Sequence, residues 1–228
     1  MNLGVLFSGG KDSVRAMMIA AEKHKIACLI TIIPENPASY MFHKPACELT
    51  VIQSKALNIP IIVRKSKGEK ESELADLKKV ISDAKKKYKI EGIVTGAVAS
   101  VYQSSRIKRI CDELDLKCIN PLWNVSQREH IFDVVKSGIK AVIVGVAGEG
   151  LDETFLGRII DKELAYELTE LEKKKGVHSA GEGGEYETFV IDCPMFQKRI
   201  EISEYSKVWD GSSGFVIIKG VNLVKKFS

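Results

Sequence analysis

The chain has 228 residues, of which 45% are hydrophobic and 28% charged, and its formal net charge at pH 7 is +4. This balance is typical of a globular protein with an apolar core and excludes a collagen-like or low-complexity chain. The small net charge argues against a dedicated nucleic-acid-binding protein, and no apolar run approaches the roughly 20 residues that a membrane span needs.

The five cysteines favour a reducing compartment. Their number is odd, and no two of them are spaced as a C-x-x-C pair, so we expect neither a disulfide framework nor a zinc ribbon. The amino terminus leads directly into an apolar run without a charged segment, so we expect no signal peptide. Together these features predict a cytoplasmic protein.

The first half of the chain alternates apolar runs with amphipathic segments. Apolar residues recur with helical spacing between the runs, as at Val14, Met17 and Ala21. Strands that are apolar throughout and alternate with helices indicate a parallel sheet covered on both faces. The expected strands are residues 3–7, 26–34, 59–65, 90–98 and 117–123. The expected helices begin at Ser13 and after Pro45, and cover residues 74–88 and 102–116.

The pattern changes after Pro121. A helix, an apolar strand, a glycine-rich loop and a second helix are followed by three segments with the character of antiparallel strands. These elements are expected at residues 126–136, 139–147, 148–158, 159–174, 185–196, 199–209 and 214–224. We therefore expect a doubly wound α/β domain over residues 1–120 and a smaller, mixed α/β domain over residues 121–228.

The turn after the first strand has the composition of an anion-binding loop. Two adjacent glycines lack a Cβ, so the backbone can lie close to a ligand. Backbone N–H groups at the start of a helix, two hydroxyl groups and a lysine would all favour a phosphate. The residues concerned are Ser8, Gly9, Gly10, Lys11, Asp12 and Ser13.

Asp12 is the exception in this loop, because a carboxylate repels phosphate. It is explained if Asp12 binds Mg²⁺, which takes carboxylate and phosphate oxygens together. The loop is not a Walker A motif, since Val5 occupies the position of the first glycine. We therefore regard Lys11 and Asp12 as the candidate catalytic pair; the alternative is an ordinary glycine turn capped by Asp12 or Ser13.

The string SGGKDS, residues 8–13, resembles the pyrophosphate-binding loop (PP-loop) of the N-type ATP pyrophosphatases, which belong to the adenine-nucleotide hydrolase-like superfamily. The resemblance implies an adenine-nucleotide α/β fold. It also implies a reaction in which a substrate oxygen attacks the α-phosphorus of ATP and pyrophosphate leaves, with Mg²⁺ as the metal.

Three further stretches resemble the diphthine–ammonia ligase (diphthamide synthase) family: residues 95–123, 150–158 and 176–196. They occur in the family's order and, with the loop, span nearly the whole chain. The resemblance implies the last step of diphthamide synthesis, in which ATP and ammonium convert the carboxylate of diphthine on translation elongation factor 2 into an amide. An acyl-adenylate would form, and AMP and pyrophosphate would be released.

The resemblance also suggests site residues outside the loop. Gly96 and Arg106 would contact ATP, although a surface salt bridge is an equal alternative for Arg106. The residues expected to contact the substrate are Tyr102, Gln103, Glu182, Glu185, Tyr186 and Glu187. A solvated acidic edge with a core tyrosine would produce the same EGGEYE pattern. His43 lies in a segment that resembles the family's loop near the nucleotide, and a structural role is its alternative.

Free ammonium is the expected nitrogen donor. Residue 2 is Asn rather than a cysteine nucleophile, and none of the cysteines has a glycine neighbour. Two other functions stay open: a tRNA-modifying enzyme of the same superfamily, which predicts salt-dependent tRNA binding, and a nucleotide sensor, which predicts ATP binding without turnover. The sequence leaves the oligomeric state open, a homo-oligomer included.

Overall fold

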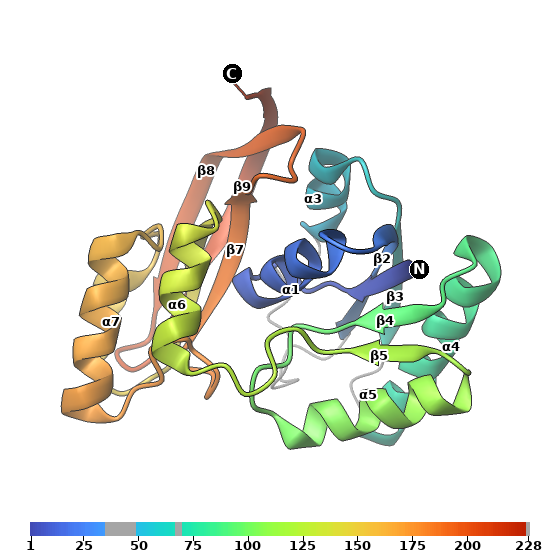
Figure 1. Cartoon of the computed structure of the whole chain (residues 1–228). Helices are drawn as coiled ribbons and strands as arrows, with labels where there is room; N and C mark the ends of the chain where they lie inside the picture. The colour runs from blue at the N-terminus through green and yellow to red at the C-terminus, as the bar shows by residue number, and fades with distance from the viewer. Residues whose placement is uncertain (35–48, 67–69, 227–228) are drawn as a thin grey trace. The chain divides into compact units, whose positions relative to one another are not determined.

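The computed structural model describes residues 1–34, 49–66 and 70–226. The chain divides into two compact units, Met1–Trp123 and Asn124–Ser228, which are described separately (Figure 1). No helix in the described ranges is both long enough and apolar enough to cross a membrane.

The first unit is built on a five-stranded sheet in which every strand pair is parallel. The strand order is β3-β2-β1-β4-β5, so the chain builds outward from β1 on one side and then crosses to the other. This confirms the doubly wound α/β fold. The strands are β1 (Asn2–Leu6), β2 (Lys25–Pro34), β3 (Ile61–Ser66), β4 (Gly92–Val94) and β5 (Lys117–Ile119). The helices are α1 (Lys11–Ala21), α3 (Thr50–Leu57), α4 (Lys70–Tyr88) and α5 (Val101–Glu113).

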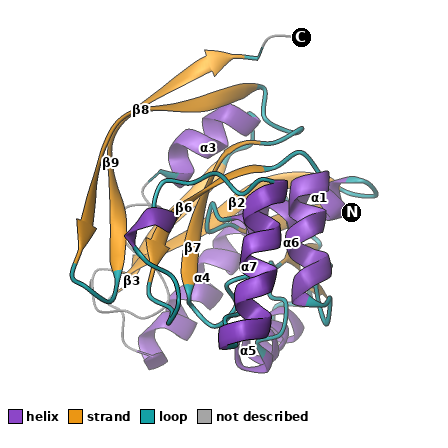
Figure 2. Ribbon diagram, turned by 90° about the vertical axis from the view of Figure 1, so that its left-hand side faces the viewer, coloured by secondary structure: helices purple, strands orange, loops and turns teal. Residues whose placement is uncertain are grey.

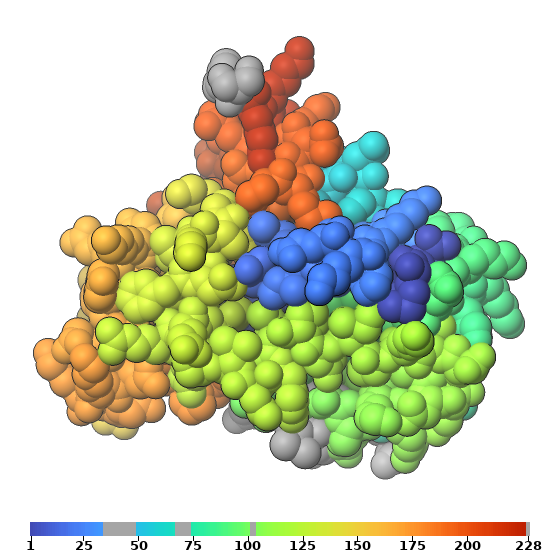
Figure 3. Space-filling model, viewed as in Figure 1, coloured from blue at the N-terminus to red at the C-terminus, as the bar shows by residue number. Residues whose placement is uncertain are grey.

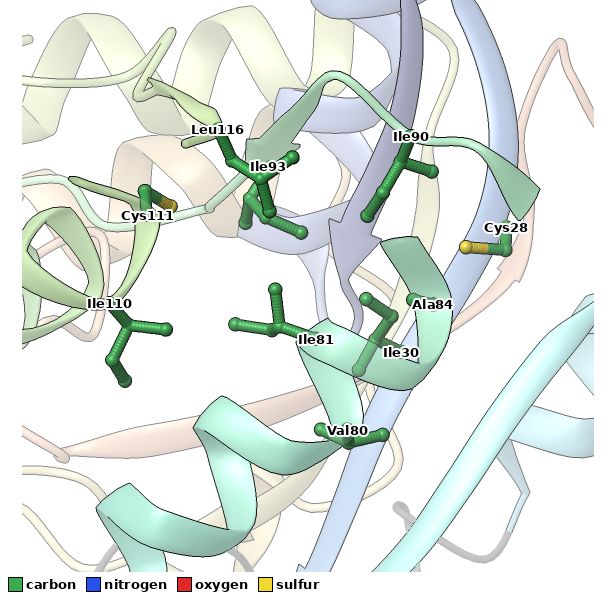
Figure 4. Close-up of a cluster of buried hydrophobic side chains, with 10 residues drawn as sticks. All are labelled: Cys28, Ile30, Val80, Ile81, Ala84, Ile90, Ile93, Ile110, Cys111 and Leu116. Carbon is green, nitrogen blue, oxygen red and sulfur yellow. The ribbon is translucent and has the colours of Figure 1, made fainter. Parts of the chain in front are cut away.

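Both faces of this sheet are covered, as continuous apolar strands require. Figure 4 shows the core on one face, where side chains of β2 and β4 meet those of α4 and α5. The residues drawn there are Cys28, Ile30, Val80, Ile81, Ala84, Ile90, Ile93, Ile110, Cys111 and Leu116. On the opposite face, α1 packs on the sheet, and its Val14 and Met17 are fully buried (Figure 1).

The second unit is built on a four-stranded antiparallel sheet of order β7-β6-β9-β8. Two helices, α6 and α7, pack against each other, with the rings of Phe132 and Tyr166 4.9 Å apart (Figure 2). Their exposed faces are yellow-green and orange in Figure 3. The strands are β6 (Lys140–Val146), β7 (Tyr186–Asp192), β8 (Lys198–Trp209) and β9 (Gly214–Lys225). The helices are α6 (Gln127–Lys136), the short 3₁₀ helix η1 (Glu153–Phe155) and α7 (Lys162–Lys175).

Several boundaries differ from those expected. The strand expected over residues 90–98 ends at Val94, because the chain turns there and Thr95 Oγ1 accepts the N–H of Ala97 at 3.0 Å. The helix expected from residue 159 begins at Lys162, because Asp161 caps it by accepting the N–H of Leu164 at 2.9 Å.

Candidate active site

The glycine-rich loop lies where the strand order of the parallel sheet reverses. It follows β1, and the loop that contains Gly96 follows β4, the neighbouring strand on the other side of the reversal. Ligands of open α/β sheets bind at such a point, beyond the carboxyl ends of the strands. Gly10 is the N-cap of α1 and has no side chain to cap the helix, so the first amides of α1 remain suited to an anion.

Gly9 adopts a conformation that favours glycine, with φ of +81°. Its carbonyl oxygen accepts a hydrogen bond of 2.8 Å from Nε2 of Gln53, a fully buried residue of α3. A Cβ on Gly9 would collide with Oε1 of the same glutamine. One turn of the loop is therefore held by a side chain 44 residues away in the sequence.

Lys11 is almost completely buried, with 3% of its surface exposed. Its Nζ lies 2.9 Å from Oδ2 of Asp12, whose side chain is 26% exposed. A buried ammonium group needs such a partner, because desolvation of an unpaired charge is costly. Ser8 Oγ donates to Ser13 Oγ at 3.2 Å, and Ser13 Oγ donates to the carbonyl of Gly10 at 3.0 Å. Both hydroxyls are thus fixed within the loop.

Gly96 lies against the first turn of α1. A Cβ at this position would be 2.8 Å from the carbonyl carbon of Asp12 and 2.8 Å from the backbone nitrogen of Ser13. The structure therefore brings Gly96 together with residues 8–13 at one edge of the sheet. Arg106 is half-buried in the second turn of α5.

Three other residues singled out in the sequence cannot be assigned contacts. Tyr102 and Gln103 belong to the first turn of α5, and their side chains lie outside the described part of the structure. His43 lies outside the described residues altogether.

The EGGEYE segment, residues 182–187, forms a compact turn in the second unit and continues into the first two residues of β7. The N–H of Gly184 donates to the carbonyl of Gly181 at 3.2 Å. Tyr186 is only 3% exposed, and its hydroxyl donates to the carbonyl of Ser179 at 2.7 Å. The tyrosine is therefore buried against the turn, whereas Glu182, Glu185 and Glu187 are half-buried.

Two polar residues that support the glycine-rich loop were not singled out in the sequence. Besides Gln53, Thr31 of β2 donates its hydroxyl to the carbonyl of Phe7 at 2.6 Å. The sequence contains a signal that could have identified Thr31, because it is the one polar residue in the run LITII, residues 29–33 of β2. A buried polar side chain is normally there because it makes a hydrogen bond.

Within the described ranges, no cluster of three or more His, Cys, Asp or Glu side chains could hold a metal ion. A magnesium ion at Asp12 would be held by this carboxylate together with phosphate oxygens, as is usual where Mg²⁺ accompanies a nucleotide.

Two buried thiols are poorly suited to nucleophilic chemistry. Burial raises the pKa of Cys28 to about 12 and that of Cys193 to about 11, so both stay protonated near neutral pH. The pKa of Cys118, in contrast, is lowered, chiefly by a hydrogen bond with Cys111, and its side chain is half-buried.

We expect maleimide at pH 8 to label Cys118 in the folded protein and to leave Cys28 and Cys193 unmodified until urea unfolds the chain, because the thiolate is the reactive form. Peptide mass spectrometry of the labelled protein measures this. Labelling of Cys193 as fast as Cys118 in the folded state would contradict its burial.

Comparison with known proteins identifies both units. The model of the diphthamide synthase N-terminal domain matches residues 1–118, and that of the diphthamide synthase C-terminal domain matches residues 126–224. A mouse protein named diphthine–ammonia ligase is 35% identical over 98% of this chain and 91% of its own length. The human protein of that name is also 35% identical, over 94% of this chain and 88% of its own length.

Among solved structures, a predicted subunit of tRNA methyltransferase from Methanocaldococcus jannaschii is 18% identical, with a TM-score of 0.46 over 85% of this chain and 98% of that one.

The two domain models follow one another over nearly the whole sequence. The N-terminal model matches the unit with the parallel sheet, and the C-terminal model matches the unit with the antiparallel sheet. The chain therefore belongs to the diphthamide synthase family.

Proposed function

We propose that the chain is a diphthine–ammonia ligase, an enzyme that amidates the carboxylate of diphthine on translation elongation factor 2 at the expense of ATP. The observation that carries this proposal is similarity to proteins of that name over nearly the full length of both partners. Relatives in mammals, fish and yeasts carry the same name. Neither a tRNA-modifying enzyme nor a nucleotide sensor has comparable support.

In the proposed reaction, a carboxylate oxygen of diphthine attacks the α-phosphorus of ATP. The bond from that phosphorus to the bridging oxygen breaks, and pyrophosphate leaves with the bonding electrons. Ammonia then attacks the carbonyl carbon of the acyl-adenylate, AMP departs, and the amide remains after loss of a proton. Charge develops on the leaving pyrophosphate, so donors already in place around it lower the barrier.

The loop of the first unit has the donors that this step needs. We assign the nucleotide's phosphates to Ser8, Gly9, Gly10 and Ser13, together with the uncapped first amides of α1. Lys11 would move from its contact with Asp12 to the leaving pyrophosphate. Asp12 would then be available for Mg²⁺, which neutralises phosphate charge when bound. Gly96 lets the connection between β4 and α5 pack closely on the first turn of α1. Arg106 is a further candidate for a phosphate contact.

We assign ATP binding to residues 1–120 and recognition of the modified factor to residues 121–228. The trimethylammonium group of diphthine is a permanent cation, and the half-buried carboxylates of Glu182 and Glu187 suit it. Tyr186 would act by holding the turn in shape, because its ring is buried and its hydroxyl bonds to Ser179. Tyr102 and Gln103 remain proposed substrate contacts.

The direct test is to incubate the chain with ATP, Mg²⁺, ammonium and elongation factor 2 that bears diphthine. We expect AMP and pyrophosphate in equal amounts, and a mass change on the factor that corresponds to OH replaced by NH₂. Glutamine in place of ammonium should give no amide, because free ammonium is the proposed donor. Release of ADP instead of AMP would refute the adenylation mechanism, and turnover with tRNA alone would identify the alternative enzyme.

A further inference from the structure

The loop of residues 176–185, which connects α7 to β7, contains three buried polar atoms that make no hydrogen bond in the structure. They are Nδ1 of His178, Oγ of Ser179 and Oε2 of Glu185. Ser179 has no exposed surface at all. Leaving a buried polar group without a partner is unfavourable, and more so for a charged one. Three such atoms in one loop lack partners, which the described protein groups do not supply.

The Glu185 side chain is held close to the backbone of the same unit. Its Oε1 accepts the N–H of His178 at 3.1 Å, and the main-chain carbonyl of Glu185 accepts the N–H of Ala147 at 2.8 Å. A Cβ on Gly183 would lie 2.5 Å from Oε1, and a Cβ on Gly148 would lie 2.6 Å from Cβ of Glu185. Because residues 148 and 183 are both glycine, the Glu185 side chain can pack closely against the backbone at these two positions.

Glu185 is not a member of the ion pairs seen among the described residues of this unit, which include Arg158 with Glu167, Lys173 with Glu170 and Lys226 with Asp192. A carboxylate oxygen buried without a cation is unfavourable. The missing partner is therefore expected to carry positive charge.

The atoms of the loop discriminate between the two cations of the proposed reaction. Ammonium has four N–H donors, and a carboxylate oxygen, a hydroxyl oxygen and an unprotonated imidazole nitrogen can each accept one hydrogen bond. A trimethylammonium group has no N–H donor and would leave all three acceptors without a hydrogen bond.

We propose that His178, Ser179 and Glu185 form the binding site for the ammonium ion that supplies the amide nitrogen. The proposal rests on the ligase function and adds the location of its second substrate. Glu185 then serves ammonium, and Glu182 and Glu187 remain for the quaternary cation of diphthine.

The test uses Ser179→Ala in the full chain. We expect the apparent KM for ammonium to rise about tenfold, which is the loss of one hydrogen bond to a charged ligand. The KM for ATP and the kcat at saturating ammonium should not change. Thr169→Val is the matched control, because Thr169 is also buried in this unit and its hydroxyl donates only within α7, to the carbonyl of Tyr166 at 2.8 Å.

A second measurement does not depend on turnover. Ammonium chloride should raise the Tm of the free wild-type protein more than sodium chloride or tetramethylammonium chloride at equal ionic strength. Glu185→Gln, which keeps the shape of the side chain and removes its charge, should abolish that difference.

The outcomes separate the site from the function. An unchanged KM for ammonium in both Ser179→Ala and Glu185→Gln would overturn the site while amide formation continued. Stabilisation of the wild-type protein by tetramethylammonium, lost in Glu185→Gln, would instead assign the loop to the quaternary cation and also overturn it. If the wild-type chain formed no amide, the ligase function would fail, and the Tm comparison alone would then decide whether ammonium binds.

Discussion

Replacing Lys11 by Met is expected to lower the rate of AMP formation by about a hundred- to a thousandfold, the range found when one preorganised donor to developing negative charge is removed. Lys11 is the buried cation of the PP-loop, and the leaving pyrophosphate is the group that gains charge in the proposed step. Methionine keeps most of the side-chain volume, so packing around the loop is retained. Release of AMP under saturating ATP, factor and ammonium measures the effect.

Lys78→Met is the control for this variant. Lys78 lies in the same unit, carries the same charge and is paired with Glu113 at 2.7 Å, but both side chains are exposed. An exposed ion pair contributes little to stability, and Lys78 lies in α4, outside the loop of residues 8–13. Neither folding nor the rate of AMP formation should therefore change. A Lys11→Met protein that folds, binds ATP and still works at the wild-type rate would remove Lys11 from the mechanism.

Gly96→Ala is expected to weaken ATP binding by about ten- to a hundredfold, because overpacking a tight contact costs roughly 1–3 kcal/mol. The added Cβ would lie 2.8 Å from backbone atoms of Asp12 and Ser13, and backbone in the first turn of a helix cannot move aside as a flexible side chain can. The amides of the loop would therefore shift away from their positions around the phosphates.

Titration calorimetry with ATP measures this loss directly, and the Tm of the variant shows whether the unit still folds. Ala99→Ser is the control, because Ala99 is exposed in the same connection between β4 and α5. Wild-type affinity in a folded Gly96→Ala protein would mean that the nucleotide binds elsewhere.

Strand and helix identity could be predicted because they depend on local patterns. Apolar runs of five to nine residues that alternate with amphipathic helices admit few folds other than a parallel sheet covered on both faces. The boundaries were less predictable. The strand expected over residues 90–98 includes the apolar Ala97 and Val98, but it ends at Val94, where the chain turns and Thr95 Oγ1 accepts the N–H of Ala97.

The candidate site could be proposed from the sequence to the extent that its residues lie in one continuous stretch. Residues 8–13 contain their own glycines, hydroxyls and charges, and the strand-to-helix position of the loop follows from the elements on either side. The EGGEYE segment was singled out from the sequence in the same way, but the sequence did not indicate which of its side chains are buried and which are accessible to a ligand. Burial distinguishes only the tyrosine: Tyr186 is buried, while Glu182, Glu185 and Glu187 are all half-buried.

By itself the sequence determined the fold class and the family, and it predicted phosphate binding by the first loop, because each of these depends on residues that are neighbours in the chain. Only the tertiary structure decided that Gln53 holds Gly9, that Gly96 packs on the first turn of α1, and that Oε2 of Glu185 is buried without a partner. The physical reason is that such contacts join residues distant in the chain. They depend on strand order and register, which hydrophobic periodicity does not encode.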